Sequence, residues 1–317
     1  MGKQEMNEKI SILLASYNGE TYIESQLHSL ACQTRAADEV LIVDDHSSDR
    51  TVSLIRQLIR GYGFENWKVI VRPENTGYAE NFIEGLKHVS GDLVFFCDQD
   101  DIWHRDKIAK MERCFQKNQE IDLLLSDSRY VYENTSQKQV NRTKELRFDR
   151  KSGKVCRRRN WPCIKGLGCT FAFRRRLVPV MQALWMPGYP HDLCAWHAAA
   201  IRGGIYLVPE ALIDYRRHGG NVSGQFERSV DFRVSEITRQ LAYLKKIEAY
   251  IRSEDKDAIS VSLREVRFQI EFYKKRANYL KEKKYILWFK MLGMLSCYDR
   301  KRNWISDFFC MASRRPE

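Results

Sequence analysis

The densest acidic group in the sequence is the run DQDD at positions 98–101, which directly follows an apolar run. Alternate side chains of an extended segment point the same way, so Asp98 and Asp100 converge on one point. Carboxylate oxygens are the hard ligands that Mg²⁺ and Mn²⁺ prefer, and crowded carboxylates favour a bound cation or a basic neighbour. The run therefore predicts a divalent metal site, and the alternative is a solvated surface turn.

Two earlier apolar runs also end in polar side chains. The first ends in Ser16, Tyr17 and Asn18, and the second ends in Asp44 and Asp45. An aromatic ring can stack on a nucleobase, and a carboxylate can accept from an imide N–H or a ribose hydroxyl, but both segments also suit helix capping. The glycine-rich fingerprint G-x-G-x-x-G is missing from the first segment, which disfavours a dinucleotide-dependent dehydrogenase.

Two later segments carry groups that could act on a substrate. Asp192 precedes an apolar helical pattern and could serve as a general base, although a plain helix cap is the stronger interpretation of this residue taken alone. Arg216 and Arg217 could contact phosphates, and His218 could bind a metal as a neutral imidazole. Read without context, this second segment is a basic turn.

The elements that would position these residues follow from the hydrophobic pattern. The first hundred residues alternate short apolar runs with amphipathic ones, which predicts βαβαβαβ and a parallel sheet covered on both faces. Ligands of such sheets bind beyond the carboxyl ends of the strands, where the polar segments stand. Residues 121–224 are less regular, with strands expected at 123–126 and near 169–174, and the chain beyond residue 225 reads as amphipathic helix.

Composition narrows the class of protein. The chain of 317 residues is 44% hydrophobic and 30% charged, which fits a globular protein rather than a disordered or fibrous one. Its nine cysteines show no C-x-x-C spacing, which argues against a disulfide framework or a zinc site. Neither a signal peptide nor an apolar run of roughly 18 residues is present, so we expect an intracellular chain that does not span a membrane.

The net charge of +12 is concentrated in residues 264–317, where lysine and arginine mix with aromatic residues such as Trp288, Phe289 and Trp304. This mixture predicts peripheral contact with an anionic membrane, and the alternative is a helical hairpin packed on the rest of the chain. A nucleic-acid-binding module is a remote alternative, because clustered carboxylates at strand ends repel a phosphate backbone.

In chain order, the segments SYNG, VDDxSxD, DQDDIW, HD and YRxHxxN resemble the family 2 inverting glycosyltransferases of GT-A fold, closest to the bacterial branch that makes rhamnose-containing polysaccharides. The resemblance spans about residues 9–224. It implies an α/β fold with a Rossmann-like, mostly parallel sheet flanked by helices, followed by a C-terminal helical extension. The implied domains are a catalytic domain at 1–224, with a nucleotide-binding half at about 1–125 and an acceptor half at 126–224, and a basic extension at 225–317.

The resemblance also implies residue roles. The nucleotide sugar would contact Ser16, Tyr17, Asn18, Asp45, Asp98 and Gln99. Mn²⁺ or Mg²⁺ would be held by Asp98, Asp100 and His218. Asp192 would be the catalytic base, and Asp101, Arg216 and Arg217 would support the metal or contact phosphate. Two positions depart from the family pattern, because Ala15 stands where many relatives carry threonine and Cys169 interrupts a Gly-Gly-Thr-like turn.

The implied activity is metal-dependent, inverting transfer of a sugar from a nucleoside-diphosphate sugar to a saccharide or lipid-linked saccharide in surface polysaccharide synthesis. The enzyme would work in the cytoplasm, on the inner face of the cell membrane. Rhamnose is the first expectation for the sugar, and a UDP-hexose such as glucose, galactose or GlcNAc is the alternative. A nucleotidyltransferase of the same fold would need a glycine-rich basic loop after the first strand, and SYNGETY has neither feature.

Overall fold

The computed structural model describes residues 8–133, 138–141, 146, 148–156, 159–163, 166–219, 229–254, 259–282 and 285–312. The chain divides into two compact units. The sheet unit comprises Met1–Cys156, Lys165–Ala199 and Gly204–Gly220, and the helical unit comprises Arg157–Ile164, Ala200–Gly203 and Asn221–Glu317. The expected boundary at residue 224 lies outside the described residues, so the domain division at that point stays a prediction.

The sheet unit is built on a nine-stranded sheet with the order β3-β2-β1-β4-β8-β6-β9-β5, and β7 pairs with β6 at its side. The parallel part consists of β1 (Ile10–Ser16), β2 (Glu39–Asp44), β3 (Trp67–Val71) and β4 (Leu93–Asp98). These strands and their crossover helices confirm the predicted βαβαβαβ pattern. Their carboxyl ends bring Ser16, Asp44 and Asp98 to one edge of the sheet.

The second part of the sheet is mixed. It consists of β5 (Ile102–Trp103), β6 (Leu123–Tyr132), β7 (Lys138–Asn141), β8 (Phe171–Arg174) and β9 (Ile205–Arg217). β8 is antiparallel to both β4 and β6, whereas β9 is parallel to β6 and antiparallel to β5. The strands expected at 123–126 and near 169–174 are present as β6 and β8. β9 was not predicted, because Pro209 and Glu210 interrupt its apolar pattern where its register with β6 shifts.

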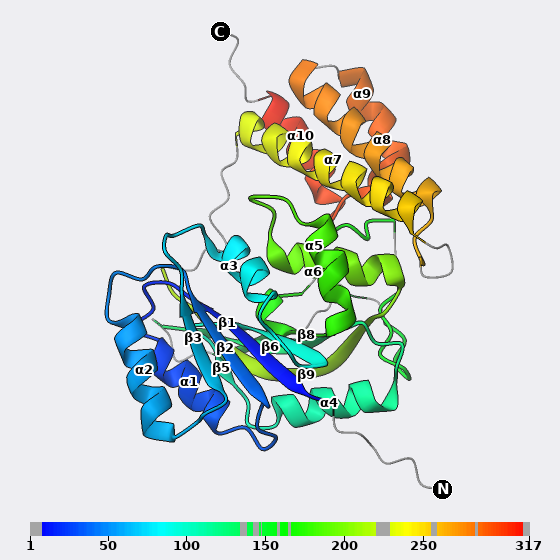
Figure 1. The fold of residues 1–317 in the computed structure, drawn as a ribbon. Helices are drawn as coiled ribbons and strands as arrows, with labels where there is room; N and C mark the ends of the chain where they lie inside the picture. Colours follow the sequence, from blue (N-terminus) through cyan, green and yellow to red (C-terminus); the bar gives the residue numbers. More distant parts are fainter. Residues whose placement is uncertain are drawn as a thin grey trace, which may run out of the picture. The chain divides into compact units, whose positions relative to one another are not determined.

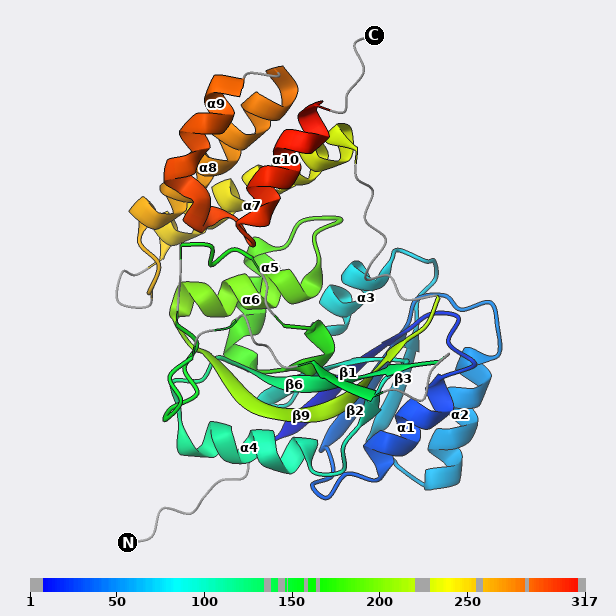
Figure 2. The ribbon, with the colours of Figure 1, turned by 180° about the vertical axis from the view of Figure 1, so that it is seen from behind.

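The sheet curls at residues 98–101, which are called here the acidic turn. β5 follows β4 after residues 99–101, yet it pairs with β9 through Ile102 and Asp214. Asp214 also forms a hydrogen bond of 2.7 Å with Nε2 of His104, just beyond β5. Figures 1 and 2 show β9 as a long curved strand. The curl carries the carboxyl end of β9 toward the acidic turn at the end of β4.

Helices cover both faces of this sheet. The helices are α1 (Ile23–Ala31), α2 (Thr51–Tyr62), α3 (Tyr78–Gly85), α4 (Lys107–Lys117), α5 (Val178–Leu184) and α6 (His191–Arg202). α1, α2 and α4 lie on one face, and α3, α5 and α6 lie on the other (Figures 1 and 2). Adjacent residues of β4 serve the two layers, since Phe95 joins the core cluster that contains Ile108 while Phe96 packs against Phe82 of α3.

The helical unit contains α7 (Val230–Ser253), α8 (Leu263–Glu282), α9 (Tyr285–Lys290), the 3₁₀ segment η4 (Met291–Cys297) and α10 (Arg302–Ala312). Helices α7 and α8 begin at capping residues. Ser229 accepts from the Phe232 N–H at 3.1 Å, and Ser262 and Glu265 form a reciprocal capping box. Within the described part of the chain, every helix is too short or too polar to cross a lipid bilayer.

The interior of the helical unit contains charged and aromatic residues, several of them from the segment 264–317 that the sequence predicts to contact a membrane. Asp307 is fully buried, and it accepts hydrogen bonds from Arg233 at 2.7 Å and from Arg276 at 2.8 and 3.0 Å. The indole rings of Trp288 and Trp304 stack at 3.8 Å and donate to each other's backbone carbonyls. Part of the basic and aromatic content of residues 264–317 therefore stabilises the unit itself.

Candidate active site

The acidic turn lies where β4 and β9 end. Asp98 is the last residue of β4, and Asp101 is completely buried just before β5. Oδ1 of Asp101 accepts from the backbone N–H of Arg216 at 3.2 Å. The predicted acidic and basic segments, more than a hundred residues apart in the chain, are therefore brought together by the curl of the sheet.

His218 and Arg216 complete this side of the turn. Nε2 of His218 lies 2.8 Å from Oδ2 of Asp100, and its ring stacks on Tyr22 with the ring centres 4.4 Å apart. The Arg216 guanidinium lies 5.0 Å from the same Tyr22 ring and donates to Ser25 at 3.0 Å. Tyr22, which sequence reasoning missed, thus packs against two of the predicted site residues.

Arg217 is placed differently from its neighbour. Its guanidinium lies 6.0 Å from the ring of Tyr215, and its backbone carbonyl accepts from the Glu133 N–H at 3.4 Å. Its predicted contact with phosphate stays a prediction.

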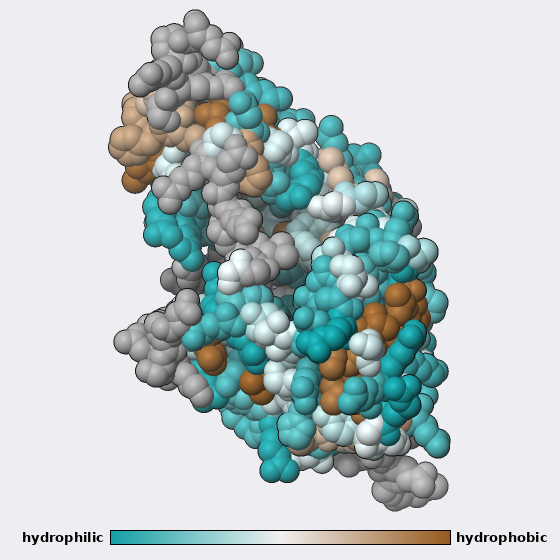
Figure 3. All heavy atoms as spheres, turned by 90° about the vertical axis from the view of Figure 1, so that its left-hand side faces the viewer, coloured by the Kyte–Doolittle hydropathy of each residue, from teal (hydrophilic) through white to brown (hydrophobic). Residues whose placement is uncertain are grey.

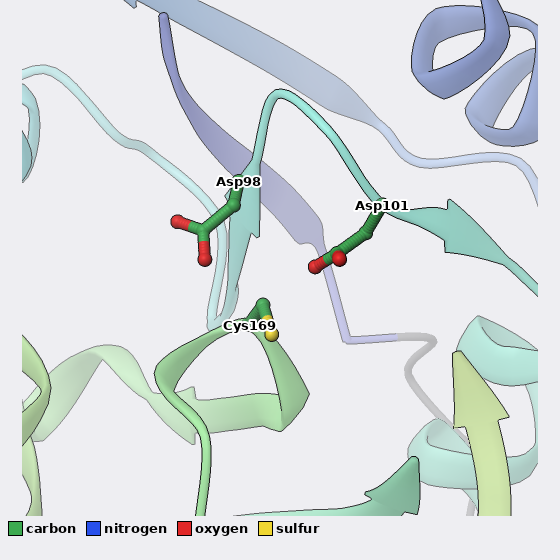
Figure 4. Close-up of side chains that lie close together, drawn as sticks. All are labelled: Asp98, Asp101 and Cys169. Carbon is green, nitrogen blue, oxygen red and sulfur yellow. The ribbon is translucent and has the colours of Figure 1, made fainter. Parts of the chain in front are cut away.

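The fit of a divalent cation can be judged from the donor atoms. Asp98, Asp100 and His218 offer two carboxylates and one imidazole, a set that suits Mn²⁺ or Mg²⁺. The structure brings a different set of ligand atoms together, those of Asp98, Asp101 and Cys169, which lie within 4.8 Å of one another (Figure 4). Cys169 comes from the 3₁₀ turn η1 (Gly168–Thr170), and its sulfur is a soft ligand that suits these ions less well. By donor type the predicted set suits the ion better, and its role as the metal site stays a prediction.

Lys107 is a further member of the cluster that sequence reasoning missed. Its side chain is fully buried, its Nζ donates to the Cys169 carbonyl at 2.8 Å, and it lies 3.8 Å from the centre of the Trp103 ring. Burial lowers the pKa of Lys107 to about 8, and the charges of Asp101 and Asp98 oppose that shift. A signal existed, since Lys107 lies four positions before Met111 on the apolar face of α4.

The carboxyl groups of the turn have raised pKa values. Burial and the charges of Asp100 and Asp192 raise the pKa of Asp98 to about 7. Burial and the charges of Asp100 and Asp98 raise the pKa of Asp101 well above its usual range. One buried lysine, Lys107, does not offset the repulsion among these carboxylates. A cation bound at the turn would therefore lower the pKa values of both Asp98 and Asp101.

Asp192 enters the site from the first turn of α6. Burial raises its pKa to about 6, although its Oδ1 accepts from the Leu193 N–H at 2.7 Å. The preceding His191 is buried and stacks on Phe82 at 3.9 Å, and burial lowers the pKa of His191 to about 3. The histidine of the HD pair is thus a neutral packing residue that anchors the start of α6, whereas the aspartate is held beside the acidic turn.

Gly168 of η1 lets the backbone approach Asp192 closely. A Cβ atom at this position would lie 2.8 Å from the Asp192 Cβ and 3.4 Å from its Oδ2. The same turn places Cys169 against the acidic cluster and Lys107. η1 therefore fixes the spacing between Asp192 and the acidic turn.

On the nucleotide side, Gln99 and Asn18 tie loops together. The Gln99 amide accepts from the Tyr17 N–H and donates to the Tyr17 carbonyl, both at 2.9 Å. Asn18 adopts a left-handed backbone with φ of 44°, and its Oδ1 accepts from the Ser48 N–H at 2.9 Å. These contacts leave the Tyr17 side chain 46% exposed at the end of β1, where a base could stack on it.

Ser16 and Asp45 are both buried and internally bonded. The Ser16 hydroxyl donates to Asp44 at 2.8 Å, and Asp44 also accepts from the Ser47 N–H at 2.7 Å. Asp45 accepts from the backbone N–H groups of Thr76 and Gly77 at 3.0 and 2.8 Å. The structure thus gives both residues a role in shaping the loops, and their direct contact with a base stays a prediction.

Curated relatives were found over much of the chain. An uncharacterized glycosyltransferase of Haemophilus influenzae is 25% identical over 276 residues, which are 81% of this chain and 80% of the relative. An uncharacterized glycosyltransferase of Nostoc is 27% identical, over 67% of this chain and 66% of the relative. The putative teichuronic acid biosynthesis glycosyltransferase TuaG of Bacillus subtilis is 36% identical, over 32% and 39%. The chain thus spans just under two thirds of the Nostoc protein and much less of TuaG.

Solved structures share the fold. TarS 1–349 of S. aureus in complex with UDP-GlcNAc superposes with a TM-score of 0.58 at 21% identity, covering 86% of this chain and 72% of TarS 1–349. The mannosyltransferase PcManGT of Pyrobaculum calidifontis, in complex with GDP-Man and Mn²⁺, gives 0.57 at 16% identity, covering 97% and 86%. The fold is therefore the predicted GT-A type. The sequence profile of glycosyl transferase family 2 matches residues 11–179, more than half of the chain, and the chain therefore belongs to that family.

Proposed function

We propose that this chain is an inverting glycosyltransferase that moves a sugar from a nucleoside-diphosphate sugar to a hydroxyl group of a saccharide acceptor. The observation that carries the proposal is the position of Asp192. Asp192 is half-buried, and desolvation raises the pKa of its carboxyl group to about 6. It lies near enough to the acidic turn for its charge to raise the pKa of Asp98. This position supports the proposal that a base and the carboxylates on the diphosphate side act in one site.

In the proposed reaction the acceptor oxygen attacks the anomeric carbon of the donor. A new carbon–oxygen bond forms as the bond from that carbon to the diphosphate breaks, and the diphosphate leaves with the electron pair. The acceptor proton passes to Asp192, which is mostly ionised at neutral pH because its pKa is about 6. A single displacement of this kind inverts the anomeric configuration.

The donor would lie along the carboxyl edge of the parallel strands. Tyr17 offers an exposed ring for the base, and the loops of Asn18, Asp45 and Gln99 form its surroundings. Asp98, Asp100 and His218 would hold Mn²⁺ or Mg²⁺ near the diphosphate, with Asp101 and Arg216 supporting them. When bound, such an ion stabilises the negative charge that develops on the leaving group.

Because of the sequence resemblance, a nucleoside-diphosphate rhamnose is the first donor to test. UDP-hexoses are the second. TarS with UDP-GlcNAc and PcManGT with GDP-Man indicate the range of donors that this fold accommodates. The acceptor is proposed to be a saccharide or lipid-linked saccharide of a surface polysaccharide. The protein would act in the cytoplasm at the inner face of the membrane, with contact through residues 264–317.

The donor can be identified with a panel of sugar nucleotides. We expect one donor to raise the unfolding temperature in the presence of Mn²⁺ and to be slowly hydrolysed to free sugar and nucleoside diphosphate. EDTA is expected to abolish both effects. A panel in which every sugar nucleotide and nucleoside diphosphate leaves the unfolding temperature unchanged, with and without Mn²⁺, would contradict the proposal.

Asp192 gives the sharpest test of the mechanism. Asp192→Asn is expected to lower turnover about 10²-fold or more, the usual contribution of a general base, while donor affinity stays nearly unchanged. The exposed Asp149→Asn is the matched control and is expected to keep full turnover. Near-normal turnover of Asp192→Asn would remove this residue from the role of base.

A further inference from the structure

The helical unit carries a group of exposed apolar side chains on α9, η4 and α10. Ile286 and Phe309 are the most exposed members, at 67% and 65%. The full set, called here the apolar surface, consists of Tyr285, Ile286, Phe289, Leu292, Ile305 and Phe309. Large apolar residues in such numbers on one small unit indicate an interaction site rather than scattered exposure.

The residues of the apolar surface lie on elements that pack against one another. Along α9 and η4, the exposed residues recur at the three- and four-residue spacing of one helix side, and Ile305 and Phe309 do the same on α10. Ring contacts join the two helices, because Trp288 lies 4.9 Å from Phe289 and 4.8 Å from Phe308, which in turn lies 5.8 Å from Phe309. Figure 3 shows apolar side chains gathered in the upper part of that view, where the helical unit lies.

A rigid framework supports these side chains. Beneath them, Trp288 and Trp304 are locked by ring stacking at 3.8 Å and by reciprocal hydrogen bonds of 3.0 and 3.1 Å. Met291 is fully buried, so η4 is anchored as well. The exposed residues are therefore held in place on packed helices, and their exposure is a property of the folded unit.

The charges beside the apolar surface are mostly positive. Lys290 ends α9, and Arg300, Lys301 and Arg302 stand at the start of α10, all of them exposed. Asp307 is the acidic residue of α10, and it is buried in its pairs with Arg233 and Arg276. The exposed charge thus complements a negatively charged partner.

We infer that the apolar surface binds the face of an anionic lipid bilayer, with α9 and α10 in the interface plane. Apolar and aromatic side chains flanked by lysine and arginine are the features of helices that lie at such an interface. Each basic side chain near an anionic surface adds attraction, which supplements the burial of the apolar groups. A bilayer fits better than a folded protein partner, because the apolar side chains match its acyl region and the basic residues beside them match its anionic headgroups.

This inference deepens the proposed function and rests on it for its purpose, because a lipid-linked acceptor would lie in a membrane. Binding to vesicles needs neither donor nor acceptor. Failure of membrane binding can therefore be told apart from failure of the transferase proposal, which is tested by donor binding and hydrolysis.

The test is cosedimentation of the full chain with vesicles of phosphatidylcholine, with and without phosphatidylglycerol. We expect binding to the phosphatidylglycerol vesicles that weakens with salt. The double variant Ile286→Ser with Phe309→Ser is expected to bind about tenfold or more weakly, through loss of two buried apolar groups. Lys301→Glu with Arg302→Glu is expected to lose at least as much on anionic vesicles.

The control variant is Val71→Ser, which removes an apolar side chain that is 40% exposed in the sheet unit. It is expected to bind vesicles like the unmodified chain, and all variants are expected to unfold at similar temperatures because the changed residues are exposed. Equal binding by the Ile286→Ser, Phe309→Ser variant and the unmodified chain would overturn the inference. So would a chain that ignores the vesicles but forms a dimer that this variant dissociates, since the surface would then bind a second copy.

Discussion

The two units of this chain each bury a charged cluster, and the clusters differ in their balance. In the helical unit, Asp307 accepts from two arginines, and although burial would raise its pKa, the Arg276 and Arg233 guanidiniums hold the pKa below its usual range. In the sheet unit, burial raises the pKa of Asp98 to about 7 and that of Asp101 well above its usual range, with Lys107 as the buried cation nearby.

The difference separates a structural cluster from a binding one. A buried carboxylate with charged partners of its own adds specificity to the fold and needs nothing further. Carboxylates that crowd one another with one buried lysine nearby favour a ligand that supplies positive charge. The balance of buried charge, rather than the burial itself, thus marks the acidic turn as the candidate site.

The largest effect is expected when the balanced cluster is broken. Asp307→Asn leaves two largely buried guanidiniums without their negative partner, which is expected to lower the free energy of unfolding by about 3–5 kcal/mol. Denaturant unfolding measures the change, with Glu271→Gln, an exposed residue paired with Lys274, as the control. A loss below about 1 kcal/mol would show that the Asp307 cluster contributes little to the stability of the fold.

The next effect concerns the unbalanced cluster. Asp100→Ala removes one predicted metal ligand together with the partner of His218, so donor affinity is expected to lose its dependence on Mn²⁺. Calorimetry with and without the ion measures this, and folding is expected to be retained because crowding is relieved. A variant that still binds donor more tightly with Mn²⁺ would place the ion elsewhere.

A smaller effect is expected at the turn that spaces the site. The new Cβ of Gly168→Ala would lie 2.8 Å from the Asp192 Cβ and must displace it. Misplacement of a catalytic group by a fraction of an ångström is expected to lower turnover roughly tenfold, with donor affinity unchanged. Gly61→Ala, where a Cβ would meet no atom, is the control, and equal turnover of the two variants would show that the spacing is not critical.

The smallest expected effect is that the two charged clusters change the stability of the fold in opposite directions as pH rises. The folded pKa of Asp98, about 7, exceeds its ordinary value of 3.8, so the folded state holds this proton more tightly, and the resulting stability is lost as pH rises toward 7. Asp307 has a lowered pKa, so its contribution is present above its ordinary pKa and is lost only in acid.

Without divalent ions, the unfolding temperature is therefore expected to fall by a few degrees between about pH 5 and pH 8, and Mn²⁺ is expected to restore it most at the higher pH. Asp98→Asn is the control, because it removes one of the carboxyl groups with a raised pKa and is expected to make the fall with pH smaller. An unfolding temperature that rises steadily with pH in the absence of metal would contradict the assignment.

The sequence predicted the parallel half of the fold because its strands are continuous apolar runs separated by amphipathic helices. It did not reveal β9, whose pattern is broken at Pro209, and so it could not show that β5 pairs across the sheet. Such pairing depends on the curl of the whole sheet, which no local window contains.

For the candidate site, too, local pattern predicted some residues and missed others. Asp98, Asp100 and Asp192 were predicted by residue type and by position at strand and helix ends, and their roles stay predictions. Lys107 was missed because a lysine on an amphipathic helix usually points to solvent. Gln99 and Asp45 were predicted to contact the nucleotide sugar, which stays a prediction. Local pattern could not show that their polar atoms also bond to the backbone of neighbouring loops.

The acidic turn is also the joint between two parts of the sheet, because β4 on one side of it and β5 on the other belong to different ladders. Any ligand that draws these carboxylates together pulls on both ladders at once. Occupancy of the turn is therefore expected to slow amide hydrogen exchange as far away as β1 and β9, well outside the atoms it touches.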